Sequence, residues 1–222
     1  MSDAEPIRDA ATIIVVRNAD EAPSVLMGQR GKTAVFMPDK FVFPGGRVDA
    51  EDGDIDLTGE LKEPCLQRLA QSNASVTPHT LAVAAIRELW EETGFVMGRQ
   101  SVWRDPPSDW SGFAEMGFRP DASQLKFFFR ALTPPGRPRR FDARFFVASE
   151  NALANGGGDI VPPTDELSHL QWVPLSEVRQ LNLAFITQLV LAELQKHLPS
   201  LEAPKGVPFV RNDALDSKVI WL

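Results

Sequence analysis

The hydrophobic pattern at the start of the chain predicts three short β-strands. A β-branched run covers residues 10–17, and residues 24–30 follow it after a turn as an antiparallel partner. A third strand at 41–43 ends just before Gly45 and Gly46. Two glycines directly after a strand allow backbone N–H groups to approach an anionic ligand, so both are candidate substrate-binding residues.

The next apolar pattern has the period of an α-helix and predicts a helix over residues 78–93. Thr77 suits the N-cap, Pro78 the first helical position, and Gly94 the position after the last turn. The apolar stripe of this helix consists of Leu81, Ala82, Ala85, Ile86 and Leu89. One face of the helix should therefore pack against the core.

The second half of the chain predicts further strands and a final helix. Residues 125–132 and 141–148 form a strand pair, 169–173 another strand, and 185–197 an amphipathic helix. Residues 98–124 have too little periodicity to assign. This order of elements predicts an α/β protein, a sandwich with helices against both faces of a mixed sheet.

Composition and charge narrow the class of protein. The chain has 222 residues, of which 43% are hydrophobic, so we expect a single domain over 1–222 with a C-terminal helix and tail at about 183–222. The net charge of −7 provides no general attraction to nucleic acid or to an anionic membrane surface. We therefore expect neither as a partner.

Cysteine use and the apolar runs bear on the compartment. Cys65 is the only cysteine, which excludes an internal disulfide and a multi-cysteine metal site. Residues 1–8 lack the layout of a secretory signal, and no apolar run approaches the roughly 20 residues that span a bilayer. These features predict a cytoplasmic protein.

Three glutamates near the end of the predicted helix carry the candidate chemistry. Glu88, Glu91 and Glu92 are spaced i, i+3 and i+4, so their carboxylates project from one face. Mg²⁺ and Mn²⁺ prefer carboxylate ligands, which makes a metal site one interpretation. A solvated acidic face is the other, although the helix dipole disfavours negative charge at this end without a compensating ion.

At these residues the chain resembles a known family. Phe-Pro-Gly-Gly at 43–46 and Arg-Glu-Leu-Trp-Glu-Glu-Thr-Gly-Phe at 87–95 resemble the two halves of the Nudix box, and the second half matches the family pattern at every position. The resemblance extends over about residues 8–198. It implies a Nudix-type α/β/α sandwich and a hydrolase that uses Mg²⁺ or Mn²⁺ to cleave a nucleoside diphosphate linked to another moiety.

The resemblance also implies roles for individual side chains. The metal ligands would be Glu88, Glu91 and Glu92. Glu91 and Glu92 would also be catalytic, and Arg87 would orient the carboxylates. Many Nudix proteins supply a general base from the loop before the last strand, which points to Glu166 ahead of Asp165. The alternative is that Asp165 and Glu166 are solvated residues of a turn before the strand and have no catalytic role.

One departure from the family pattern is large. Gly46 and Arg87 are separated by 40 residues, several times the usual spacer, so an insertion at about 47–76 splits the box. The position of the first box glutamate falls on Asp52 counted forward from Gly46 and on His79 counted backward from Arg87, and we assign the role to neither. The insertion is either a passive loop or a lid or wall that selects the larger part of the substrate.

A split box is similar to the subgroup that includes the peroxisomal coenzyme A diphosphatases, which implies a coenzyme A-like substrate. In the strand pattern at 141–148, Arg144 is a candidate to bind a substrate phosphate. The expected partner is thus a small organic diphosphate. The alternatives are a Nudix-fold sensor that binds its ligand without turnover, and a structural or interaction protein. The sequence leaves the oligomeric state open, a homodimer included.

Overall fold

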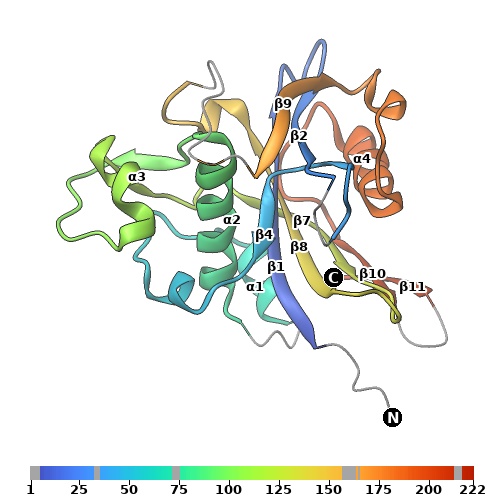
Figure 1. The fold of residues 1–222 in the computed structure, drawn as a ribbon, viewed down its shortest axis with the longest axis horizontal. Helices are drawn as coiled ribbons and strands as arrows, with labels where there is room; N and C mark the ends of the chain where they lie inside the picture. The colour runs from blue at the N-terminus through green and yellow to red at the C-terminus, as the bar shows by residue number, and fades with distance from the viewer. Residues whose placement is uncertain (1–5, 33–35, 72–75, 157–163, 165, 213–216) are drawn as a thin grey trace.

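A mixed sheet forms the centre of the molecule, with helices on both of its faces (Figure 1). The computed structural model describes residues 6–32, 36–71, 76–156, 164, 166–212 and 217–222. The sheet strands are β1 (Ile7–Arg17), β2 (Ser24–Arg30), β3 (Phe41–Val42), β4 (Gly45–Arg47), β7 (Lys126–Leu132), β8 (Arg140–Ser149), β9 (Leu167–Pro174), β10 (Pro208–Asn212) and β11 (Ser217–Trp221). The helices are α1 (Cys65–Ala70), α2 (Pro78–Thr93), α3 (Ser111–Glu115) and α4 (Phe185–His197). This arrangement confirms the predicted α/β sandwich.

The strand order of the sheet is β11-β10-β7-β8-β1-β2-β3, with β4 also paired to β1 and β9 to β2. The predicted antiparallel pair β1–β2 and the predicted strand pair β7–β8, also antiparallel, are both present. β1 and β8 pair in parallel at the centre of the sheet, from Ile7 opposite Arg140 to Val16 opposite Ser149. β4 pairs antiparallel with the first half of β1, so the glycine turn is fixed at the middle of the sheet.

The predicted helix α2 forms with the expected ends. The Thr77 side chain accepts a hydrogen bond from the backbone N–H of Thr80, and Pro78 occupies the first turn. Gly94 ends the helix in the left-handed conformation, with φ of 73°. These local signals fix where α2 stops, and the stop places the three glutamates in the last two turns of the helix.

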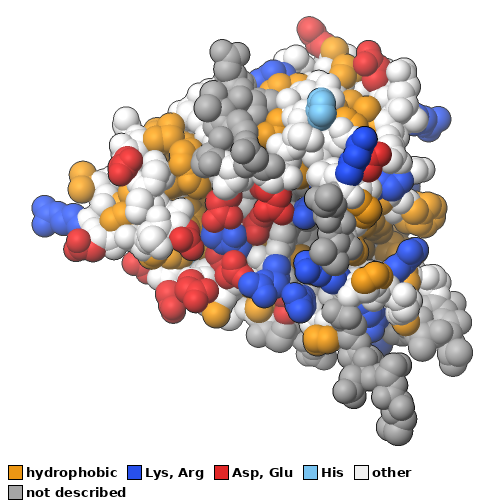
Figure 2. Space-filling model, viewed as in Figure 1, with side chains coloured by type: hydrophobic (Ala, Val, Ile, Leu, Met, Phe, Trp, Pro, Cys, Tyr) orange, Lys and Arg blue, Asp and Glu red, His pale blue; other side chains and the backbone are white. Residues whose placement is uncertain are grey.

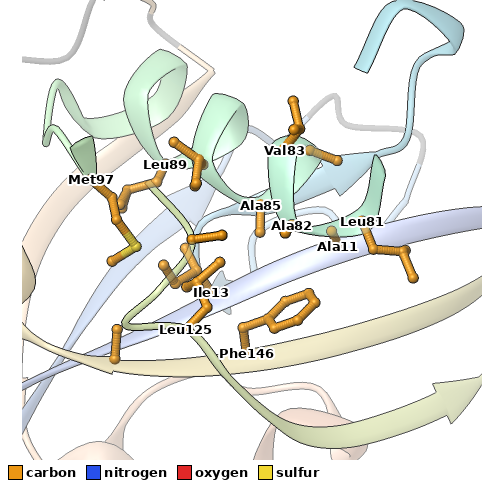
Figure 3. Close-up of a cluster of buried hydrophobic side chains, with 14 of the residues drawn as sticks. Ala11, Ile13, Leu81, Ala82, Val83, Ala85, Leu89, Met97, Leu125 and Phe146 are labelled. Carbon is orange, nitrogen blue, oxygen red and sulfur yellow. The ribbon is translucent and has the colours of Figure 1, made fainter. Parts of the chain in front are cut away.

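Two buried clusters lie on opposite faces of the sheet. Figure 3 shows the α2 side chains Leu81, Ala82 and Leu89 directed toward Ile13 of β1 and Phe146 of β8. The second cluster joins the other face of the sheet to α4. The apolar stripe of α2 therefore packs against the sheet. The polar face of the helix, which carries the three glutamates, lies outside this cluster.

The insertion at 47–76 is packed into the first cluster. It contains a 3₁₀ helix, η1 (Ala50–Asp54), and the short helix α1. The apolar residues Ile55, Leu61, Cys65 and Leu69 are all buried among core residues of α2 and the sheet. The described part of the insertion is therefore packed as part of the core, and its role toward the substrate stays a prediction.

Two regions contain elements that the sequence did not predict. Residues 98–124 form a small two-stranded sheet of β5 (Gly98–Gln100) and β6 (Phe118–Pro120), with a 3₁₀ helix (Ser108–Trp110) and α3 between them. The tail beyond α4 holds the hairpin β10–β11, which joins the main sheet through β7. In the part of the chain that the structure describes, no helix is both long and apolar enough to cross a membrane.

Candidate active site

The three predicted glutamates line one side of α2 beside the sheet. Glu88 and Glu92 are buried and Glu91 is half-buried. In Figure 2 acidic side chains gather around a cationic one on this face, over α2 and β4. The site is thus a partly enclosed acidic cluster. The burial of Glu88 and Glu92 excludes the alternative of a fully solvated acidic helix face.

The glycine turn is seated on two of these carboxylates. The backbone N–H of Gly45 donates a hydrogen bond to Oε2 of Glu92 at 2.8 Å. A Cβ atom at Gly46 would lie 2.5 Å from Oε1 of Glu88, and one at Gly45 would lie 2.6 Å from the Ala11 carbonyl oxygen. Only glycines permit this contact between β4 and α2.

This contact corrects the predicted role of the turn. The Gly45 N–H was expected to face an anionic ligand, whereas it donates to Glu92. Gly46 lies opposite Ala11 in the strand ladder and not in an open loop. Gly45 therefore positions Glu92 through its N–H, Gly46 leaves room for Glu88, and substrate binding by either glycine stays a prediction.

Arg87 connects the cluster. Its Nη1 donates to Oε1 of Glu88 and to Oε2 of Glu91, both at 3.0 Å. Its Nη2 donates to the Arg47 carbonyl oxygen at 2.9 Å, which ties the helix to the end of β4. The guanidinium is buried, so these contacts fix the two carboxylates in place.

Asp52, to which the sequence assigned no role, holds Arg87 in the site. Its carboxylate is 1% exposed and accepts from Nε of Arg87 at 2.8 Å and from Nη2 at 3.1 Å. It also accepts from the Asp49 backbone N–H at 2.8 Å, which closes a capping box on η1. The six-residue spacing from Gly46 was the signal for this residue. His79, the other candidate, contacts the Ile55 carbonyl oxygen and Glu60 instead.

Burial and mutual repulsion raise the proton affinity of the cluster. Loss of solvation raises the pKa of Glu88 to about 7, against an opposing effect of Arg87 and a further increase from Glu91. Desolvation and the charge of Glu88 raise the pKa of Glu92 well above its usual value. The pKa of Glu91 is also raised, mainly by burial. The carboxylates therefore outweigh the positive charge of Arg87, and a further cation would stabilise the cluster.

The loop before β9 brings Glu166 to this cluster. Its charge raises the pKa of both Glu88 and Glu92, and its Oε1 lies 3.1 Å from Nη2 of Arg30. The neighbouring Thr164 donates from Oγ1 to the Glu91 carbonyl oxygen at 2.8 Å. Glu166 is exposed, while Asp165 lies outside the described residues. The structure thus brings the predicted loop carboxylate to the end of α2 that carries the glutamates.

Arg144 corrects a second prediction. It is fully buried and forms an ion pair with Asp9 and a 2.7 Å hydrogen bond to the Asp142 carbonyl oxygen. Residues 144 and 146 share one face of β8, and Phe146 packs beneath α2, so the guanidinium points into the protein. Arg144 therefore belongs to a buried charge network and is not exposed to bind a phosphate.

The donor set suits a divalent metal ion in its chemistry. Oε1 of Glu92 is buried and accepts no hydrogen bond from the described residues. It is therefore an available carboxylate oxygen near the carboxylates of Glu88 and Glu91. Within the described ranges, no three carboxylate, imidazole or thiol groups already converge as a metal site, because Glu88 and Glu91 turn toward Arg87. A divalent ion would be held by Oε1 of Glu92 with Oε2 of Glu88 and Oε1 of Glu91, the oxygens that Arg87 does not contact.

The fold is an α/β sandwich with helices on both faces of a mixed sheet. Its candidate site combines the Gly45–Gly46 turn with the carboxylates of α2. Residues 76–194, more than half of the chain, match the NUDIX domain family. The chain therefore belongs to the Nudix hydrolase family.

Two curated relatives are similar to this chain. It is 29% identical to a putative nudix hydrolase 7 of Caenorhabditis elegans over 77% of this chain and 52% of the relative. It is 26% identical to the acyl-coenzyme A diphosphatase NUDT19 of Xenopus laevis over 58% of this chain and 47% of the relative. The chain thus spans about half the length of the curated relatives it matches.

Two solved structures are also similar. A NUDIX hydrolase from Alicyclobacillus acidocaldarius is 28% identical, with a TM-score of 0.67 over 86% of this chain and 91% of that protein. The NUDIX domain of Shewanella oneidensis NrtR, solved with ADP ribose, is 14% identical, with a TM-score of 0.51 over 86% of this chain and 88% of that domain. The second likeness concerns the fold alone.

Proposed function

We propose that this protein hydrolyses the diphosphate linkage of a small organic molecule with water and Mg²⁺ or Mn²⁺. The observation that carries the proposal is the buried carboxylate cluster of α2, in which Glu92 keeps a buried oxygen without a hydrogen bond from the described residues. Such a cluster is costly without a cation, and a cation bound there could contact phosphate oxygens. Membership of the Nudix family supports this activity.

Each residue of the site has a part in the proposed reaction. Glu88, Glu91 and Glu92 would hold the ion, which would supply activation of water and neutralisation of phosphate charge. Arg87, held by Asp52, orients Glu88 and Glu91. Glu166 would accept the proton of the attacking water, and attack at phosphorus breaks the bond to the bridging oxygen. The products are two phosphorylated molecules.

The substrate class that we propose is a coenzyme A-like or other nucleoside diphosphate linked to a larger group. Two features support it, the split box and the similarity to a relative named as an acyl-coenzyme A diphosphatase. The net charge of −7 disfavours nucleic acid and anionic membranes as partners. The absence of cysteine pairs agrees with a cytoplasmic location.

The test is a panel of organic diphosphates with Mg²⁺ or Mn²⁺, scored by the masses of the products. Coenzyme A, acyl-coenzyme A, ADP-ribose and a dinucleotide would form the panel. We expect two phosphorylated products from at least one of them, and none when the metal is chelated. Binding of a panel member without any product, at full metal occupancy, would favour the sensor alternative.

A further inference from the structure

The edge of the sheet formed by β11 carries an inference that does not depend on the proposed activity. β11 is the last strand on its side, and its described pairing is with β10 alone. All five of its side chains are exposed, including Val219 at 60% and Trp221 at 62%. Figure 1 shows β10 and β11 on the side of the sheet away from α3. The candidate active site on α2 lies elsewhere.

The hydrogen bonds at the end of the hairpin show which way the backbone of β11 points. Val207 and Leu222 exchange two backbone hydrogen bonds, at 3.0 and 2.9 Å. Such pairs alternate along an antiparallel ladder, and the register continues without a shift to Asn212 opposite Ser217. The amides of residues 218 and 220 therefore face β10. Those of Ser217, Val219 and Trp221 face away from the sheet.

Lys218 is the one usual protection against pairing that this edge carries. Proline, a bulge or charged side chains commonly block an edge strand in monomeric proteins. Residues 217–221 contain no proline, the β10–β11 register has no bulge, and Lys218 is the only charged residue. The outward row of N–H and C=O groups is therefore suited to accept another strand.

We propose that β11 pairs with β11 of a second copy of this chain, antiparallel and about a two-fold axis at Val219. In that register Val219 lies opposite its own counterpart, and Ser217 lies opposite Trp221 of the second copy. All three outward-facing residues are then used, with about six backbone hydrogen bonds between the copies. The same patch serves on both subunits, as an isologous interface requires.

Charge favours this register over the neighbouring one. An axis at Val219 places Lys218 opposite Ile220 of the second copy, so like charges do not meet. An axis at Lys218 would place two ammonium groups directly opposite each other, which is destabilising. Val219, Ile220 and Trp221 are exposed, and each would lie opposite a side chain of the second copy in the favoured register. A single strand pair is smaller than a standard interface, so we expect micromolar affinity.

Sedimentation of the whole chain between about 1 and 200 µM tests the proposal. The wild type should shift from monomer to dimer over this range. Val219→Glu and Val219→Lys, each alone, should weaken association at least about tenfold because like charges then face each other at the axis. An equimolar mixture of the two variants should restore the dimer, because opposite charges then face each other.

Controls separate this interface from misfolding and from general charge effects. Val102→Glu changes another exposed valine, far from β11 in sequence and outside the main sheet, and should leave association unchanged. Val219→Pro removes only an outward N–H, so it should dissociate the dimer while the far-ultraviolet circular dichroism stays that of the wild type. A wild type that stays monomeric, or a Val219→Glu variant that dimerises like the wild type, would overturn the proposal.

Discussion

Asp52 and Arg87 are joined by two parallel hydrogen bonds, Oδ1 to Nε at 2.8 Å and Oδ2 to Nη2 at 3.1 Å. One residue comes from the insertion and the other from α2. Arg87 passes this restraint on to Glu88 and Glu91, which it contacts through Nη1. The segment that splits the box in sequence therefore supplies the carboxylate that completes its hydrogen-bond network.

The first prediction concerns this pair. Asp52→Asn removes the negative charge from a buried ion pair and should destabilise the protein by about 3 kcal/mol. It should also lower hydrolysis about 10- to 100-fold, because Arg87 no longer holds the metal-binding carboxylates in one orientation. Thermal unfolding and initial rates measure the two effects. Asp54→Asn, the same change at an exposed position of η1, should alter neither. Equal behaviour of the two variants would refute the role of Asp52.

The second prediction concerns pH and metal together. Burial raises the pKa of Glu88 from 4.5 to about 7, so the folded protein binds this proton more tightly than the unfolded chain. The stability that this proton provides is present below pH 4.5 and is lost as the pH rises through about 7. Without metal, the melting temperature should fall over this window.

Mg²⁺ competes with that proton for the carboxylate. Its stabilising effect should therefore be larger at pH 8 than at pH 5.5, since metal ligands must be deprotonated. Thermal unfolding with and without Mg²⁺ at both values measures the difference. The same shift at both pH values would show that the α2 cluster does not bind the ion.

The third prediction assigns the general base. Glu166→Gln should lower turnover by at least about tenfold and flatten the acidic limb of the pH–rate profile, because the proton acceptor is lost. Asp165→Asn is the matched change at the adjacent position and should have a smaller effect. If both variants stay within about threefold of the wild type, the base lies elsewhere and the carboxylates of α2 become the candidates.

The fourth prediction concerns the packing of the insertion. Leu69 and Leu66 both lie on α1, but Leu69 is 1% exposed and Leu66 is 39% exposed. Leu69→Ala should cost about 2–5 kcal/mol of unfolding free energy, the usual range for a buried leucine. Leu66→Ala should cost less than about 1 kcal/mol. Urea denaturation compares them, and similar costs would mean that α1 does not pack as described.

The elements that the sequence predicted well are those with strong local signals. Thr77, Pro78 and Gly94 fixed α2 because capping depends on neighbouring residues. The run at 10–17 is predicted as a strand because it is mostly apolar and rich in β-branched residues, and most of its side chains are buried. The second half of the Nudix box is also a local signal, because its glutamates are spaced along a single helix.

The parts that were missed depend on contacts between distant segments. The strands β10 and β11 have no clear alternation, and their pairing with β7 appears only in three dimensions. Arg144 occurs in a strand pattern that does not reveal which face is buried, and its partner Asp9 is distant in sequence. Asp52 had the right spacing but the wrong residue type, and only its contact with Arg87 shows its role.

The central claim is that the carboxylates of α2 support attack of water on a diphosphate linkage. Hydrolysis in ¹⁸O-labelled water with Mg²⁺ tests it most directly, with wild type, Glu91→Gln and Glu92→Gln compared by product mass. The wild type should place one labelled oxygen in a single phosphorylated product, and each variant should be folded but at least about a hundredfold slower. Undiminished, metal-independent hydrolysis by both variants would contradict the account.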